Sequence, residues 1–447
     1  MLINMNRHIF IILVLGLSVR LMLFFHFLDT PKFFWEDDST TYIHSAENTL
    51  TGNGFSLKTQ PPYIPDPFRT PGYPVFLMIH KILFGSYYAA LITQLIMAAA
   101  TAFIFFLLAK EYGSLKIGYL SSAIFIAMPF SIGINLKFMT QTFFTFILAL
   151  AVWYWIKFLK YEENKHLLAV AILLPLLALI RPIAQFVYLP FLISFIYTAW
   201  IGGKLKARKI ARVCLIIGAI FFVGIFPWLF RNYLTFGHFS LSSIISLQMY
   251  FYDAPAVYAH SRGISYSEAS KILLREAQEH FGTAEQTEFD ALFSSGAYLK
   301  ERAWGIIFES PVSFIVVRTT QFIKFFIRDG IHYWFEDPLP RPEISLSFIK
   351  SITPMLFLVI LERIFLSILF LGMITTAILS FWDKNKERKM MTGFLILVIL
   401  YFAGLSGIMS SAGLRYPIEG FFILLGLLGI QRALWLARDS IESNFLS

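Results

Sequence analysis

Two adjacent carboxylates stand near the start of the segment WEDDSTTYIHSAENTLTGNGFS, which covers residues 35–56. Asp37 and Asp38 follow an apolar run that ends near Leu28, and Tyr42 and His44 come within a few residues of them. A carboxylate in such a place can take a proton from an acceptor hydroxyl or amine as a general base. A carboxylate pair can also bind a divalent cation, with Mg or Mn as candidates. The segment therefore carries candidate chemistry at the end of an apolar element.

Four arginines lie in short motifs elsewhere in the chain. They are Arg69 in FRTPGYP, Arg181 in LIRP, Arg231 in PWLFRN and Arg415 in LRYP. A guanidinium group can bind a phosphate through two parallel N–H bonds. A carboxylate base and a phosphate clamp would serve one reaction only if the chain brings them to the same place. The elements that carry these motifs therefore have to be located.

The composition indicates a membrane protein. Of the 447 residues, 57% are hydrophobic, 17% aromatic and only 15% charged, and the mean hydropathy is +0.67. A soluble domain cannot keep that much apolar surface from water. The single cysteine, Cys214, excludes an internal disulfide and a thiolate metal cluster. The net charge of +9 is explained by loop lysines and arginines of a cytoplasmic face and predicts no nucleic-acid partner.

Ten apolar runs are long enough to cross a bilayer, which takes about 20 residues. The first is expected to be a retained span, because no small-residue cleavage site follows it. The strongly basic loops GGKLKARKIAR and DKNKERK fall on the same side when the runs alternate, and the positive-inside rule assigns that side to the cytoplasm. The runs cover residues 8–28, 87–109, 115–131, 137–157, 166–181, 183–201, 211–230, 353–381, 390–410 and 417–436.

This topology predicts five regions. Residues 1–28 form the first span, 29–86 the first outer segment, 87–230 six spans, 231–352 a second outer segment, and 353–447 three spans with a short cytoplasmic tail. The apolar stretch 304–328 is expected to lie flat in the outer interface or within the bundle, because a span there would move DKNKERK outside. The short stretch 75–84 is also expected at the interface. Both carboxylates and all four arginines then share the outer face.

The motifs and their order resemble one group of membrane enzymes. DSTTYIHSAENTLTGNGFS followed by FRTPGYPVFLMIHKILFG looks like the first outer loop of GT-C glycosyltransferases. The likeness is greatest to the dolichyl-phosphate-mannose:protein mannosyltransferase and aminoarabinose-transferase group, which is PMT/ArnT-like. The later motifs LIRP, PWLFRNYLTFGHFSLSS and LRYPIEGF appear in the same order.

The resemblance implies an inverting transfer of a sugar from a polyprenyl-phosphate donor. Asp38 matches the position of the general base, with Asp37 or a divalent cation assisting. Positions four apart share a helix face, so Asp38 and Tyr42 should point the same way. Tyr42, His44 and Tyr73 are expected to line the substrate site. The expected ligands of the donor phosphate are Arg69, Arg231, Arg415 and Arg181.

One position departs from the family pattern. In LKFMTQTFF, Gln141 stands where a glutamate usually follows Met-Thr or Met-Ser. A glutamine cannot act as a base or as a charged metal ligand. The departure puts a family-like role of the second outer loop in question.

Simpler interpretations of the same residues stay open. Asp37 or Asp38 could cap a helix that begins near Ser39, and His44 could be a polar surface residue. Each arginine could be an interfacial anchor that extends to the headgroups. The whole chain could be a lipid-linked sugar transporter or flippase, although the polar groups concentrate at one face rather than mid-membrane. A catalytically lapsed relative is the other alternative, because of Gln141.

The sequence thus predicts an all-α integral membrane protein with a GT-C-type multispan bundle and an outer helical cap. The predicted activity is transfer of a hexosyl or pentosyl group to an extracytoplasmic acceptor. Lipid A or lipopolysaccharide, a protein or a cell-envelope glycan all fit as acceptor. The predicted partners are the polyprenyl-phosphate sugar, its acceptor and membrane lipids. The family likeness places the protein in a bacterial inner membrane with its site facing outside the cytoplasm.

Overall fold

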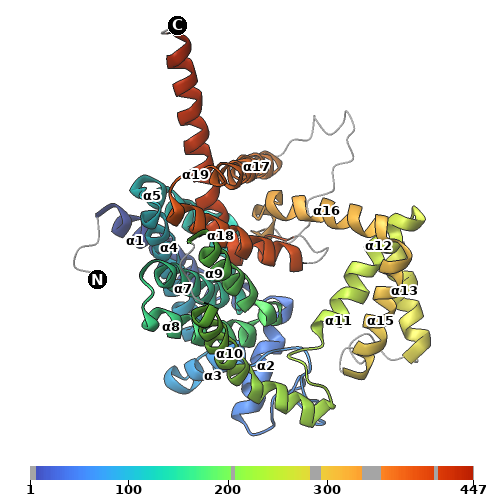
Figure 1. Cartoon of the computed structure of the whole chain (residues 1–447). Coiled ribbons are helices and arrows are strands. Elements are labelled where there is room, and N and C mark those ends of the chain that lie inside the picture. The colour runs from blue at the N-terminus through green and yellow to red at the C-terminus, as the bar shows by residue number, and fades with distance from the viewer. Residues whose placement is uncertain (1–6, 203–206, 282–292, 335–353, 407–410, 446–447) are drawn as a thin grey trace.

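The computed structural model describes residues 7–202, 207–281, 293–334, 354–406 and 411–445. Helices make up nearly all of this part of the chain (Figure 1). Within it, β structure is limited to one isolated bridge between Ser56 and Pro65. The predicted all-α fold class is therefore confirmed. Residues 335–353 of the predicted second outer segment and 407–410 of the predicted span 390–410 lie outside the described residues.

Each predicted span coincides with a helix. By length and composition, seven described helices can cross a membrane, or up to nine if two bent pairs are each one span. One bent pair is α5 and α6, which meet at 58° where Pro129 begins α6. The helices of this bundle are α1 (Arg7–His26), α4 (Tyr88–Glu111), α5 (Leu115–Ala127), α6 (Pro129–Asn135), α7 (Thr140–Tyr161), α8 (Asn164–Ile180), α9 (Tyr188–Gly202), α10 (Ala207–Phe236), α17 (Pro354–Ser380), α18 (Lys386–Leu405) and α19 (Ala412–Phe445).

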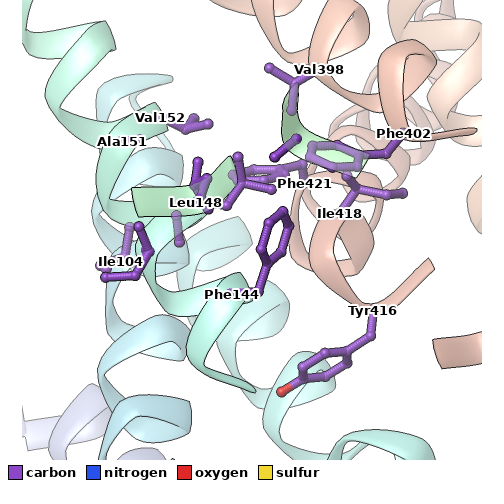
Figure 2. Close-up of a cluster of buried hydrophobic side chains, with 14 of the residues drawn as sticks. Ile104, Phe144, Leu148, Ala151, Val152, Val398, Phe402, Tyr416, Ile418 and Phe421 are labelled. Carbon is purple, nitrogen blue, oxygen red and sulfur yellow. The ribbon is translucent and has the colours of Figure 1, made fainter. Parts of the chain in front are cut away.

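Helix α7 lies at the centre of the apolar core. Figure 2 shows its residues Phe144, Leu148 and Val152 facing Phe402 of α18 and Phe421 of α19. All five side chains are buried. Such a core holds the N-terminal end of α7 in a fixed place relative to the last two helices.

Helices α17 and α19 approach each other at small residues. A Cβ atom on Gly429 would lie 1.8 Å from the carbonyl oxygen of Gly372, and one on Gly372 would lie 2.3 Å from the carbonyl oxygen of Gly426. The two backbones are therefore in direct contact, as in small-residue packing of membrane helices.

The first outer segment contains the 3₁₀-helix η2 (Pro31–Phe34) and the helices α2 (Asp37–Leu50) and α3 (Gly72–Phe84). Helix α2 begins two residues earlier than the expected start near Ser39. Its cap is Glu36, whose backbone N–H donates to Ser39 Oγ over 2.8 Å. The interpretation of the two aspartates as cap residues is therefore wrong, because both lie in the first helical turn. After α2 the chain turns at Gly52, whose φ of 81° favours glycine.

A second group of helices forms a lobe beside the bundle, which we call the cap (Figure 1). It has its own small apolar core, which includes Tyr250, Leu273 and Ile306. Helices α15 and α16 meet at an angle of 100°. The cap comprises α11 (Ile244–Gln248), the π-helix η4 (Met249–Asp253), α12 (Ala254–Arg262), α13 (Tyr266–Phe281), α15 (Phe293–Glu309) and α16 (Pro311–Ile327), followed by the 3₁₀-helix η5 (Ile331–Trp334).

Helix α16 covers most of the stretch 304–328 that the sequence places at the outer interface. It exposes Val312 and Ile315, which are 72% and 62% accessible, and it also carries Arg318 and Lys324. This mixture suits the headgroup zone of a bilayer. The interfacial position stays a prediction.

The cap is attached at both of its ends, first to the turn before α3 and then to α17 of the bundle. Before α11, the backbone N–H of Ser243 donates to the carbonyl of Pro67 over 3.0 Å, and Ser242 Oγ donates to the carbonyl of Phe68. After α16, the backbone N–H groups of Gly330 and Ile331 each donate to the Glu362 carboxylate over 3.0 Å. The first attachment ends directly beside Arg69.

Candidate active site

The two aspartates at the start of α2 differ in their surroundings. Asp37 is exposed, whereas the side chain of Asp38 is 46% accessible and faces Arg69. Arg69 Nη2 lies 2.6 Å from Asp38 Oδ1. Among the described residues, no donor reaches the other carboxylate oxygen of Asp38. One carboxylate oxygen of Asp38 is therefore bound by the Arg69 guanidinium group, and the second is left for another group.

Arg69 binds one face of α2 with its whole guanidinium group. Nε donates to Thr41 Oγ1 over 2.9 Å and Nη1 donates to the Tyr42 hydroxyl over 3.3 Å. The guanidinium carbon also lies 4.7 Å from the centre of the Tyr42 ring. Asp38 and Tyr42 therefore do share a helix face, as their spacing indicates.

A buried carboxylate fixes the turn that carries Arg69. Asp66 is fully buried and accepts the backbone N–H groups of Phe68 and Arg69 over 2.7 and 3.0 Å. Its second oxygen accepts Ser45 Oγ from α2 over 3.1 Å. Burial raises the pKa of the Asp66 carboxyl, and its hydrogen bonds oppose that rise. This one side chain therefore fixes the position of the arginine relative to α2.

The groups that contact Arg69 compensate for its burial. Removal from water alone would lower the pKa of the guanidinium, but Tyr42 and Asp38 raise it above its ordinary value. Arg69 thus carries its full charge at physiological pH.

Tyrosines form the floor of this cluster. The Tyr42 and Tyr73 rings meet edge to face, with their centres 5.1 Å apart, and the Tyr73 hydroxyl donates to Gln94 Oε1 over 2.7 Å. Burial raises the pKa of Tyr42, and Arg69 opposes that rise. The Tyr42 hydroxyl also lies near the side chain of Thr140, the first residue of α7. Tyr42 therefore connects the first outer segment to the start of α7.

Arg181 lies beside the cluster, where α8 ends. It interacts electrostatically with Tyr42, Asp38 and Arg69, and its guanidinium carbon is 5.8 Å from the centre of the Phe144 ring. Across the described ranges its guanidinium group has neither a hydrogen-bond partner nor an ion-pair partner. Its N–H donors are therefore open to a ligand.

Arg231 and Arg415 hold other parts of the protein. Arg231 donates to the carbonyls of Asp66 and Phe55, both over 3.0 Å, and so binds the first outer segment to α10. Arg415 is fully buried and pairs with the equally buried Glu419 over 3.1 Å. It also donates to the backbone carbonyls at the end of α16, those of Phe325, Phe326 and Arg328.

His44, another predicted site residue, makes a contact of its own. His44 Nδ1 is 3.2 Å from the carbonyl oxygen of Leu57. In the part of the chain that the structure describes, no three His, Cys, Asp or Glu side chains lie close enough together to bind a metal ion. Asp38 already faces the guanidinium group of Arg69, and Asp37 is exposed. A role of Asp37 and Asp38 in binding Mg or Mn stays a prediction.

A buried arginine beyond the predicted set holds α6 in place against α1. Arg20, on α1, is 1% exposed and donates to Asn135 Oδ1 over 2.8 Å and to Ser131 Oγ over 3.0 Å. Asn135 in turn donates to the Tyr416 hydroxyl over 2.8 Å and to Thr142 Oγ1 over 2.9 Å. An intramembrane charge in an apolar run is the signal that could have found it.

Comparison with known proteins identifies the type of fold. Residues 69–229 match the model of the family described as dolichyl-phosphate-mannose-protein mannosyltransferase. The match begins at Arg69 and ends before Arg231, so Asp38 lies outside it. No curated protein has a significant sequence match to the chain.

Solved structures resemble the whole chain. The oligosaccharyltransferase of Archaeoglobus fulgidus in its apo form has a TM-score of 0.53 at 16% identity, over 99% of this chain and 52% of that one. The same organism's oligosaccharyltransferase AglB, in complex with an inhibitory peptide and a dolichol-phosphate, has a TM-score of 0.51 at 15% identity, over 97% and 52%. ArnT from Cupriavidus metallidurans bound to undecaprenyl phosphate gives 0.42 at 12% identity, over 94% and 77%.

The predicted resemblance to PMT/ArnT-like GT-C membrane enzymes is therefore confirmed. The chain spans about half the length of the oligosaccharyltransferase structures that it matches. The fold is that of a multi-pass membrane protein of the GT-C type.

Proposed function

We propose that this protein is a GT-C glycosyltransferase that transfers a sugar from a polyprenyl-phosphate donor to an acceptor, with Asp38 as the general base. The observation that carries the proposal is the cluster of Asp38, Arg69 and Tyr42 at the start of α2, with Arg181 beside it. The mannosyltransferase family match and the dolichol-phosphate in the similar AglB structure support this class of donor.

The unbound carboxylate oxygen of Asp38 would accept the proton of the acceptor hydroxyl. The acceptor oxygen then forms a bond to C1 of the sugar as the bond between C1 and the phosphate oxygen breaks. The electron pair of that bond leaves with the polyprenyl phosphate. Attack on the face opposite the phosphate inverts the configuration at C1.

Two arginines would stabilise the leaving phosphate as its negative charge grows. Arg69 has already directed three of its five N–H donors to Asp38, Thr41 and Tyr42. Its principal role is to orient the base and to add positive charge. Arg181 has its donors open and is the better placed for a bidentate contact with phosphate. Arg231 and Arg415 already bind backbone carbonyls, so in this proposal they support the site from outside it.

The charge distribution of the loops supports an extracytoplasmic site. The basic stretch DKNKERK follows α17 and continues into the first turn of α18, and the positive-inside rule assigns it to the cytoplasm. The first outer segment with Asp38 then faces away from the cytoplasm. A bacterial inner membrane, and an acceptor that is lipid A, a protein or an envelope glycan, complete the proposal.

The test is the pair of variants Asp38→Asn and Asp29→Asn. Both replace a carboxylate of the first outer segment by an isosteric amide, but Asp29 is exposed and lies outside the cluster. Purified protein is incubated with labelled polyprenyl-phosphate sugars and a set of acceptors. Loss of a general base lowers the rate about 10²- to 10⁴-fold, so Asp38→Asn should lose transfer and Asp29→Asn should keep it.

The same preparation separates the alternative functions. Movement of the labelled lipid across liposomes without transfer would identify a flippase and end the proposal. Full activity of Asp38→Asn would remove Asp38 from its role as base.

A further inference from the structure

A cavity of about 260 Å³ lies between α16 of the cap and α18 of the bundle. One water needs about 10–15 Å³ of such space, so the cavity has room for a phosphate ester. No residue of its lining belongs to the cluster around Asp38. The lining consists of Arg318, Thr319 and Phe322 from α16 and of Ala403 and Gly404 from α18.

The cavity lies at the end of a membrane span. Helix α18 is one of the helices that can cross a membrane, and it has 20 residues. At about 1.5 Å per residue it is about 30 Å long, which is the thickness of the hydrocarbon core of a bilayer. Gly404 directly precedes Leu405, the last residue of the helix. The cavity therefore lies at the depth of the lipid headgroups, whichever way α18 crosses the membrane.

Exposed apolar side chains flank the cavity on both helices. Ile315 and Ile323 lie one helical turn to either side of Thr319, and Leu400 lies one turn before Gly404. These three side chains are 62%, 45% and 45% accessible. Exposed apolar surface on a membrane protein is covered by acyl chains. A ligand of the cavity therefore meets lipid beside it.

Arg318 brings a positive charge that no carboxylate of the described residues balances through an ion pair. Its Nη2 atom donates to the carbonyl of Gly404, which joins the two helices of the cavity. Its guanidinium carbon lies 5.9 Å from the centre of the Phe314 ring. A guanidinium group has five N–H donors, so the bond to Gly404 leaves four for a ligand. A cation at headgroup depth attracts the anionic lipids of the membrane.

We propose that this cavity binds the headgroup of an anionic glycerophospholipid. The lipid phosphate accepts the remaining donors of Arg318, which can form two parallel N–H bonds with it. The hydroxyl of Thr319, which is exposed beside Arg318, adds a further donor. The acyl chains follow the exposed faces of α16 and α18. Because the lipid contacts both helices, it joins the cap to the bundle.

Two variants act on the cavity in different ways. Arg318→Gln removes the charge and keeps a polar side chain. Gly404→Leu keeps Arg318 and narrows the cavity, and a Cβ atom at Gly404 would meet nothing within 4 Å. The added side chain therefore enters open space and should not disturb folding. Arg275→Gln is the matched control, because Arg275 is an exposed arginine of the cap outside the lining.

The experiment measures lipid binding by the full-length protein in a neutral detergent. Phosphatidylglycerol is titrated, and native mass spectrometry gives the fraction of protein that carries a lipid. Loss of a hydrogen bond to a charged group weakens binding about 10-fold. Arg318→Gln should lower the affinity for the first bound lipid by about this factor. Gly404→Leu should lower it too, and Arg275→Gln should bind as the wild type does.

Three other ligands identify the source of the phosphate. Glycerol phosphate has the headgroup without acyl chains and should not displace phosphatidylglycerol at equal concentration. Phosphatidylcholine carries its own cation and should bind more weakly to the wild type, with little dependence on Arg318. Polyprenyl phosphate has an isoprenoid chain instead of two acyl chains, and its binding should also be unaffected by Arg318→Gln.

Equal affinity for phosphatidylglycerol in the wild type, Arg318→Gln and Gly404→Leu would overturn the inference. Displacement by glycerol phosphate at equal concentration would overturn the assignment to a lipid. Binding of polyprenyl phosphate, in place of phosphatidylglycerol, that depends on Arg318 would overturn the choice of a glycerophospholipid. Because no sugar transfer is measured, these results are independent of whether Asp38 acts as a base.

Discussion

The substitution Arg69→Lys separates the charge of Arg69 from its geometry. A lysine ammonium keeps the positive charge, but it is a single point on a flexible stem and cannot match a planar fork. It can retain the contact with Asp38, while the hydrogen bonds to Thr41 and Tyr42, of 2.9 and 3.3 Å, are lost. At about 1 kcal/mol for each lost hydrogen bond, the orientation of Asp38 loses about 2 kcal/mol of support. If the transition state needs that orientation, kcat falls about 30-fold.

The assay is transfer of labelled sugar at saturating donor by the purified protein, together with its thermal unfolding temperature. The KM for the donor should change less than kcat, because the charge near the phosphate is kept. Arg275→Lys on α13 is the matched control, since Arg275 is exposed and lies in the cap. An Arg69→Lys variant with wild-type kcat would show that the hydrogen bonds to Thr41 and Tyr42 play no part in catalysis.

Two further predictions concern the bundle. Gly429→Ala should destabilise the protein by at least about 1–3 kcal/mol through overpacking, because the added Cβ would lie 1.8 Å from a carbonyl oxygen of α17. The control is Gly218→Ala, where the space is open; it should leave the unfolding temperature in detergent unchanged or slightly higher. Equal effects of the two substitutions would contradict the close contact between α17 and α19. Glu419→Gln leaves the buried charge of Arg415 without its partner and should cost about 3 kcal/mol, measured as a lower unfolding temperature; a neutral effect would mean that the backbone carbonyls alone satisfy Arg415.

Hydropathy and local spacing were sufficient for much of the fold. Every predicted span contains a helix, because a run of apolar residues in lipid has few other ways to satisfy its backbone. The spacing of Asp38 and Tyr42 placed both on one helix face, and the motif FRTPGYP supplied the arginine that bridges them. The shared helix face follows from the spacing of neighbours in sequence, whereas the contact between Arg69 and Asp38, 31 positions apart, was not predicted.

The predicted sidedness assigned all four arginines to one face but did not give their lateral positions. Arg181 lies beside the cluster of Asp38, whereas Arg231 and Arg415 bind backbone carbonyls elsewhere. The contact between Arg20 and Asn135 joins residues 115 positions apart. Such a pairing depends on how the helices pack around each other, which no local pattern encodes.

The attachment of the cap has a consequence for the geometry around Arg69. Ser243 and Ser242 bind the carbonyls of Pro67 and Phe68, and the next residue along the chain is Arg69. At the opposite end, Glu362 anchors Gly330 and Ile331 to α17. A displacement of the cap would therefore act on the turn that carries Arg69 and, through the ion pair, on Asp38.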